Sequence, residues 1–196
     1  ALLFVLGLML LVSSGCPAGD DDDSSSDDDD SSSDEDDCVG EDWFAQTSGT
    51  TKYLRGVHFF DAMTGWAVGE NGVILDTSDG GANWVAQTSG TTENLISVHF
   101  VDAMTGWAVG RLGTIVKTAD GGMNWTPQTS GTSEEFRDIH FANAQVGWTV
   151  GYTGTIVNTS DGGATWAAQT SGTTKNLESV HFSNAQVGWV VGLSGT

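Results

Sequence analysis

The chain has 196 residues, with 26 acidic and six basic side chains, and its formal net charge at pH 7 is −20. Residues 20–37 contain twelve of the acids and six serines but no apolar side chain, so this short run carries −12 of the charge. The other fourteen acids and six bases leave a net charge of only −8. Because proteins neutralise nucleic-acid phosphates with clustered Lys and Arg, this composition argues against nucleic acid as a partner.

The first sixteen residues have the pattern of an export signal. Residues 1–12 (ALLFVLGLMLLV) are apolar throughout, but a bilayer span needs about 20 such residues, so they fit the core of a secretory signal. No initiator Met or basic segment precedes them, and we expect a sequence truncated at its start. Ser13-Ser14-Gly15-Cys16 resembles a bacterial lipobox, which would make Cys16 a lipidation site. The alternative is an ordinary signal cleaved nearby.

Residues 17–41 predict a disordered Asp/Ser-rich tether, because such a run repels itself and cannot bury apolar surface. If Cys16 is lipidated, Cys38 has no partner within the chain; if it is not, a Cys16–Cys38 disulfide is possible in an oxidising compartment. We favour the first option. The expected protein is an exported lipoprotein of the bacterial outer membrane or cell surface, in contact with the membrane only through its lipid anchor.

From Trp43 onward the sequence repeats every 41 residues, in units 43–83, 84–124, 125–165 and 166–196. One period predicts four strands, because β-rich segments alternate with short links of Gly, Asn, Asp or Ser. These strands are Leu95–Val101, Gly106–Gly110, Gly113–Thr118 and Asn124–Thr129. No segment has a sustained 3.6-residue period, so almost no helix is expected.

Four antiparallel strands in each repeat of this length predict the blade of a β-propeller, an all-β fold that would occupy residues 42–196. Asp42–Thr47 (DWFAQT) reads as a lone fourth strand, of the kind that completes the last blade of a ring. The last unit stops where its third strand begins. We therefore expect about three and a half blades and a closing strand, as a fragment of a larger propeller.

A turn motif ends each of the first three units: TSDGGANW at Thr77–Trp84, then TADGGMNW and TSDGGATW at intervals of 41 residues. The motif resembles the Asp-box of sialidase-type propellers. Its two glycines permit positive φ, its Asp can accept backbone hydrogen bonds, and its Trp can cover the turn. A metal site is the alternative, but one carboxylate is far from the six to eight oxygens of Ca²⁺. The predicted structural positions are Asp79, Gly81, Trp84, Asp120, Gly122, Trp125, Asp161, Gly163 and Trp166.

The whole pattern of a unit, with Leu-x-x-Val-His-Phe, Gly-Trp-Ala-Val-Gly, Gly-Thr-Ile-Val-Lys-Thr and Asp-Gly-Gly-x-x-Trp, resembles the photosystem II assembly and stability factors over residues 42–196. That resemblance implies a seven-bladed propeller. In photosynthetic members, which lie in the thylakoid lumen, clustered arginines contribute to binding photosystem II subunits. The arginines of this chain are Arg55, Arg111 and Arg137.

Strand direction sorts the loops onto two ends of the blades. At one end, the motif turn and the link between the first two strands are nearly constant, with DAMTG twice and NAQVG twice. At the other end, the turns vary and gather most of the basic residues, so we predict a partner-binding surface there. Its predicted residues are Lys52, Tyr53, Arg55, Arg111, Arg137, Tyr152 and Lys175. The alternative is neutral drift on exposed turns.

His58, His99, His140 and His181 also recur once per unit. They could ring a channel and bind a metal, but no second ligand lies at the usual spacing, so we predict packed histidines bonded to backbone. The paired tryptophans of a unit, such as Trp66 and Trp84, are predicted to form the core between blades. No cofactor is expected.

Two classes of function remain. The first is a non-enzymatic propeller that binds a protein or peptide, or acts as an assembly scaffold. The second is a sialidase-type glycoside hydrolase whose catalytic residues lie in missing blades, since we find neither an Arg-Ile-Pro start nor an isolated, non-repeating acid in a core strand. We favour the first.

Overall fold

A computed structural model describes residues 45–195. The predicted signal, lipidation site and tether, residues 1–16 and 17–41, lie outside the described residues. Within 45–195 there is no helix long and apolar enough to cross a membrane. The strands are β1 (Leu54–Phe59), β2 (Gly65–Gly69), β3 (Ile74–Thr77), β4 (Val85–Gln87), β5 (Leu95–Phe100), β6 (Gly106–Gly110), β7 (Ile115–Thr118), β8 (Thr126–Gln128), β9 (Phe136–Phe141), β10 (Gly147–Gly151), β11 (Ile156–Thr159), β12 (Ala167–Gln169), β13 (Leu177–Asn184) and β14 (Val187–Gly192).

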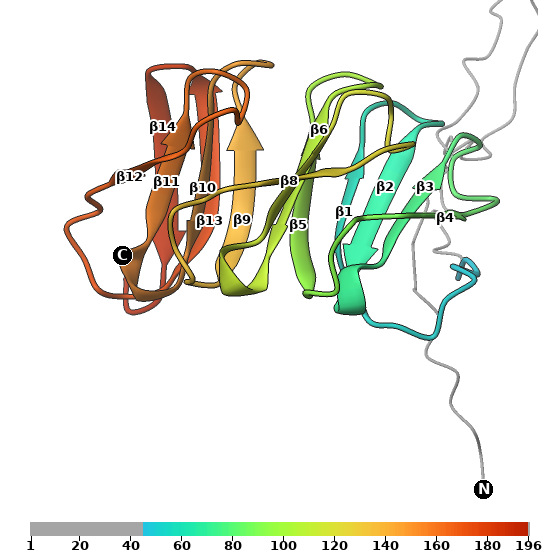
Figure 1. The fold of residues 1–196 in the computed structure, drawn as a ribbon, viewed down its shortest axis with the longest axis horizontal. Helices are drawn as coiled ribbons and strands as arrows, with labels where there is room; N and C mark the ends of the chain where they lie inside the picture. The colour runs from blue at the N-terminus through green and yellow to red at the C-terminus, as the bar shows by residue number, and fades with distance from the viewer. Residues whose placement is uncertain (1–44, 196) are drawn as a thin grey trace, which may run out of the picture.

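The strands form three antiparallel sheets of four, β1 to β4, β5 to β8 and β9 to β12, followed by the pair β13 and β14. Each sheet is ordered as in the sequence, because each turn connects neighbouring strands. The first strands of successive sheets, β1, β5, β9 and β13, pack against one another, and Figure 1 shows the sheets following each other across the molecule. These are propeller blades, so the predicted fold class is confirmed.

The predicted strand bounds are correct to within two residues. Gly113 lies in a single turn of 3-10 helix, η2 (Arg111–Gly113), and not in β7; η1 (Glu70–Gly72) and η3 (Tyr152–Gly154) are its equivalents. Most of the predicted strand Asp42–Thr47 lies outside the described residues, and its described part, 45–47, forms no strand. Even so, Gln46 contacts the first blade: its Nε2 donates to the Gly80 carbonyl at 3.3 Å.

Aromatic side chains fill the space between blades. The ring of Phe100 stacks on Trp66 of the preceding blade at 3.4 Å and meets Trp125 edge-on at 5.8 Å. Trp66 is buried, and its indole N–H donates to the Gly121 carbonyl across the blade boundary. Phe141 repeats both contacts with Trp107 and Trp166. Aromatic pairs of this kind add about 0.5–1.5 kcal/mol to the effect of burial. They confirm the predicted core role of Trp66, whereas Trp84 is only partly buried and meets Phe59 of its own blade edge-on at 6.0 Å.

Candidate protein-binding face

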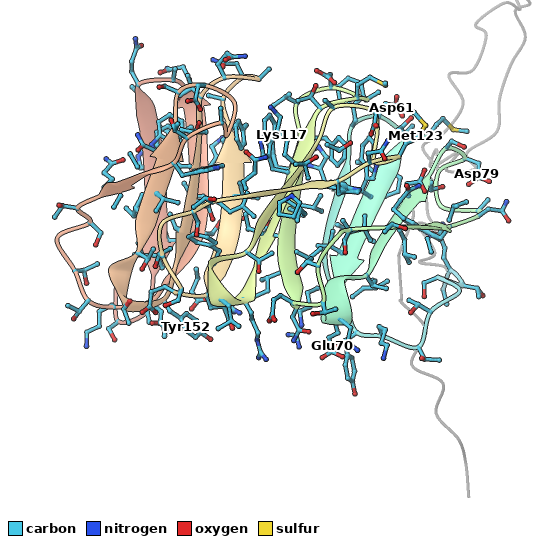
Figure 2. The ribbon with its side chains drawn as sticks, viewed as in Figure 1. Asp61, Glu70, Asp79, Lys117, Met123 and Tyr152 are labelled. Atoms are coloured by element: carbon cyan, nitrogen blue, oxygen red, sulfur yellow. The ribbon has the colours of Figure 1, made fainter. Side chains whose placement is uncertain are left out.

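Figure 2 separates the two ends of the blades: Glu70 and Tyr152 lie at one end, and Asp61, Asp79, Lys117 and Met123 at the other. We call the first the variable face, which contains the turns around residues 52–55, 93–96, 134–137 and 175–178 and the short helices η1 to η3. The second is the aspartate-turn face, named for Thr77–Trp84 and its equivalents. The predicted sorting of loops onto two ends is therefore correct.

Each aspartate turn is closed by its own side chains. Asp79 accepts from the backbone N–H of Asn83 at 2.9 Å, from the Asn83 side chain at 2.7 Å and from the Thr77 hydroxyl at 2.8 Å. The buried Thr77 hydroxyl also accepts from the Gly81 N–H at 2.9 Å, a role that the sequence reasoning missed. Gly80 and Gly81 have φ of 69° and 89°, which side chains with a Cβ rarely adopt.

These hydrogen bonds stabilise the charged form of each carboxylate. The hydroxyl and backbone N–H of Thr165 and the hydroxyl of Thr159 lower the pKa of Asp161 to about 2. The side chain and backbone of Asn83 and Asn124 lower the pKa of Asp79 and of Asp120 in the same way. The aspartates therefore act as ionised caps of their turns. Within residues 45–195, no group of three or more His, Cys, Asp or Glu side chains is arranged to hold a metal ion.

The four histidines form a row along the first strands of the blades. Neighbouring rings lie 5.0, 4.8 and 4.6 Å apart from His58 to His181. Burial, together with the charges of His58 and His140, lowers the pKa of His99 to about 3 despite a hydrogen bond to the Phe141 backbone. His58 and His140 make the equivalent bonds to Phe100 and Phe182. His58, His99 and His140 are therefore partly buried, backbone-bonded residues, as predicted, whereas His181 is exposed.

On the variable face, one cluster gathers three of the predicted site residues. Arg111 Nε lies 3.0 Å from Glu135, and Arg137 contacts Glu135 at 3.4 Å and Glu178 at 2.9 Å. The Arg137 guanidinium also lies over the Tyr152 ring, 5.6 Å from its centroid. Partial burial opposes the charge of Arg137, but Glu178, Tyr152 and Glu135 outweigh it and raise its pKa. The cluster joins the second, third and fourth blades.

The other predicted residues of this face are not part of that cluster. Arg55 forms a separate ion pair with Glu70 at 3.0 Å. Lys52, Tyr53 and Lys175 are exposed on their turns. The sequence reasoning missed Glu135 as the acceptor that joins Arg111 and Arg137. A signal was available, because Glu135 occupies the position of Asn94 and Asn176 in the neighbouring units.

The tips of η1 to η3 have unusual backbone. Asn71, Leu112 and Thr153 have φ near 55°, a left-handed conformation that Asn tolerates and that costs Leu and Thr about 1 kcal/mol or more. Asn94 accepts from the backbone N–H of Asn71 at 3.0 Å, and Asn176 does the same for Thr153 at 3.2 Å. The turns are thus anchored to the following blade.

One expectation from the sequence was wrong. Asp138 is an isolated acid in an inner strand, β9, where the other units have Gly56, Ser97 and Ser179. Both of its oxygens are occupied: Oδ1 accepts from Ser97 and from its neighbour's backbone N–H, and Oδ2 accepts from Ser179 and the Val180 N–H, all within 2.9 Å. Asp138 thereby connects three blades. The sequence reading missed it because the equivalent positions in the other units hold small residues, so the position looked merely variable.

Repeated four-stranded blades, closed by aspartate turns and bearing a face of varied turns, define a β-propeller with a candidate surface for macromolecular binding. A family model, Photosynthesis system II assembly factor YCF48, matches residues 36–127 and 128–195. The chain therefore belongs to the YCF48 family, which confirms the resemblance found in the sequence. Comparison with curated protein sequences gave no match.

Solved structures agree with this assignment. The structure of YCF48 bound to D1 peptide has 29% sequence identity and a TM-score of 0.57, and the match covers 65% of this chain and 45% of that one. YCF48 from Cyanidioschyzon merolae has 20% identity and a TM-score of 0.63, covering 72% and 48%. The chain thus spans less than half of these two proteins. A glycoside hydrolase, GH74 from Niastella koreensis, has a TM-score of 0.54 at 15% identity, covering 79% and 32%, and shares the fold alone.

Proposed function

We propose that this chain is part of a non-enzymatic propeller that binds a protein or peptide segment through its variable face, as an assembly factor would. The observation that carries the proposal is the cluster of Arg111, Arg137 and Tyr152 around Glu135. Family membership and the D1-peptide complex of a relative with 29% identity support it. Asp138, the isolated acid of an inner strand, uses both oxygens in hydrogen bonds to neighbouring blades, which favours a structural role for it.

The contacts of the cluster suit recognition. Arg and Tyr are the residues that most often anchor interfaces. Ion pairs and the stacking on Tyr152 hold Arg137 in place before a partner arrives, which reduces the entropy lost on binding. Because Glu135 and Glu178 stand beside the arginines, the face is mixed in sign and favours a partner with both charges over a general polyanion.

Binding of the D1 peptide by the full chain tests the proposal. Arg111→Ala with Arg137→Ala should weaken binding by about tenfold or more, because each removes a candidate anchor. Lys117→Ala is the matched control: it also removes positive charge, but Lys117 lies on the other face, over the Trp107 ring. Equal affinity of the arginine variant and the control would contradict the choice of face. Absence of any binding by the unaltered chain would contradict this peptide as its partner.

We also propose that Cys16 is lipidated and tethers the propeller to a bacterial outer membrane or cell surface. The support is the apolar run followed by Ser13-Ser14-Gly15-Cys16. In a bacterial host, Cys16→Ser should move the protein from the membrane fraction to the soluble fraction. Cys38→Ser, the control, should leave it with the membrane. Membrane association of the Cys16 variant would count against the anchor.

A further inference from the structure

The aspartate-turn face of the first two blades has a patch of exposed apolar side chains. Its members, which we call the methionine patch, are Phe60, Met63, Met104 and Met123, exposed by 46%, 53%, 50% and 69%. Neighbouring large apolar side chains with such exposure are typical of an interaction site on a soluble domain. Figure 2 shows Met123 at the same end of the blades as Asp61 and Asp79.

Hydrogen bonds bring these residues to one region. The Phe60 N–H donates to the Thr64 carbonyl, so Phe60 and Met63 share one link. The Met104 carbonyl accepts from Gly121 in the turn that contains Met123. The same turn is also bound to the first blade, because the indole N–H of Trp66 in β2 donates to the Gly121 carbonyl at 3.0 Å. The turn that carries Met123 is therefore bound to β2, the strand that follows the link with Phe60 and Met63.

The third and fourth units show that the fold does not require these side chains. At the positions of Met63 and Met104 they have Gln145 and Gln186, and at the position of Met123 the third motif has Ala164. The link keeps its geometry, because Asn143 accepts from the backbone N–H of Gln145 at 2.9 Å as Asp61 does from Met63 at 2.8 Å. The other blades fold in the same way without these methionines, so folding does not explain why the first two blades expose them.

The charge around the patch defines what would bind it. Asp61 and Asp102 border it where the later units have neutral Asn143 and Asn184. Backbone N–H groups of Met63 and Thr64 lower the pKa of Asp61, so it is ionised at physiological pH. In the described part of the chain, Lys117 is the single basic residue outside the variable face. Negative charge beside flexible, polarisable thioethers suits a ligand that is both basic and apolar.

We propose that the methionine patch is a second interaction surface, which docks a basic amphipathic segment of another protein. An anionic lipid surface is disfavoured, because Asp61 and Asp102 would be repelled by its headgroups. A second copy of this chain is disfavoured in the same way, since it would bring the aspartates together. This surface is independent of the variable face and lies at the opposite end of the blades.

The test uses the full chain and a short synthetic amphipathic peptide of leucine and lysine, with binding measured by calorimetry and by the spectra of isotope-labelled methionine methyl groups. Met63→Gln, Met104→Gln and Met123→Ala together import residues of the third unit, so the melting temperature should stay the same. Affinity should fall by about tenfold or more, because the apolar contact is lost. Asp61→Asn with Asp102→Asn should weaken binding as well.

The matched control is Leu112→Gln, which removes an exposed apolar side chain from the variable face and should leave affinity unchanged. The acidic run at residues 20–37 is the same in all variants, and the methionine exchange alters no charge, so binding to that run cannot imitate the effect. Four results would overturn the proposal: no binding by the unaltered chain, equal loss in the control, equal binding of a leucine–glutamate peptide, or self-association of the chain that depends on these methionines.

Discussion

The buried hydroxyl of Thr118 is predicted to hold the second aspartate turn together, and Thr118→Val isolates its contribution. The hydroxyl donates to Asp120 at 2.8 Å and accepts from the Gly122 and Asp120 N–H groups at 2.9 and 3.2 Å. Thr118 is only 1% exposed, so water cannot replace the hydroxyl. Valine keeps the shape of the side chain but leaves the Gly122 N–H buried without an acceptor, which costs about 1–3 kcal/mol. The hydrogen bond from the hydroxyl to Asp120 is lost as well, so the expected total destabilisation is about 2–3 kcal/mol.

Urea unfolding of the full chain, followed by tryptophan fluorescence, measures this change. With a slope of about 1–3 kcal/mol per molar urea, the midpoint should fall by about 1 M. Thr126→Val on β8 is the control, because Thr126 is exposed and should change stability by no more than about 0.5 kcal/mol. If the two variants unfold at the same urea concentration, the turn does not depend on the hydroxyl and the reasoning fails.

Three further predictions concern the core, the histidine row and the variable face. Phe141→Ala should lower the free energy of unfolding by about 3–5 kcal/mol in the same assay, and Phe59→Ala by clearly less, because Phe141 is buried against Trp107 whereas Phe59 is only partly buried. The pKa of His99 is about 3 in the fold and 6.5 in an unfolded chain, so the unfolded state binds more protons between these pH values. The urea midpoint should therefore fall as the pH drops from 6.5 toward 3, and His99→Gln should make that fall smaller. Leu112→Asn should raise stability by about 0.5–1 kcal/mol, because Asn tolerates the left-handed backbone, and an unchanged or lower midpoint would show that Leu112 is not strained.

Local features of the fold were accessible from the sequence because each depends on residues close together in the chain. Strand alternation, paired glycines and the 41-residue period located the blades, and the short links fixed their antiparallel order. The one shifted strand start also has a local cause. The Thr114 N–H donates to the Arg111 carbonyl and closes η2, so β7 begins at Ile115, two residues after the predicted start at Gly113.

Contacts between blades were not accessible, because they depend on how one sheet is rotated against the next. The repeat shows that Glu135 and Asp138 differ from their equivalents in neighbouring units, but it does not show that each joins elements on neighbouring blades. The same limit applies to the first aspartate turn, where Gln46 accepts from the Trp84 indole at 3.3 Å. In the second turn the equivalent Trp125 N–H is buried without a partner, while Gln87 donates to Asp76 instead.

Internal repeats separate structural from functional residues without reference to other proteins. Gly110 recurs in every unit because a Cβ there would collide with the Asn94 carbonyl, so its recurrence reports packing. Asp61 and Asn143 differ in charge but make the same backbone hydrogen bonds, so the fold accepts either. Positions such as Asp61, where the fold accepts more than one residue, can vary in order to bind a ligand. They lie on both faces of this chain, which is why the two proposed surfaces can be tested with exchanges that the chain itself already contains.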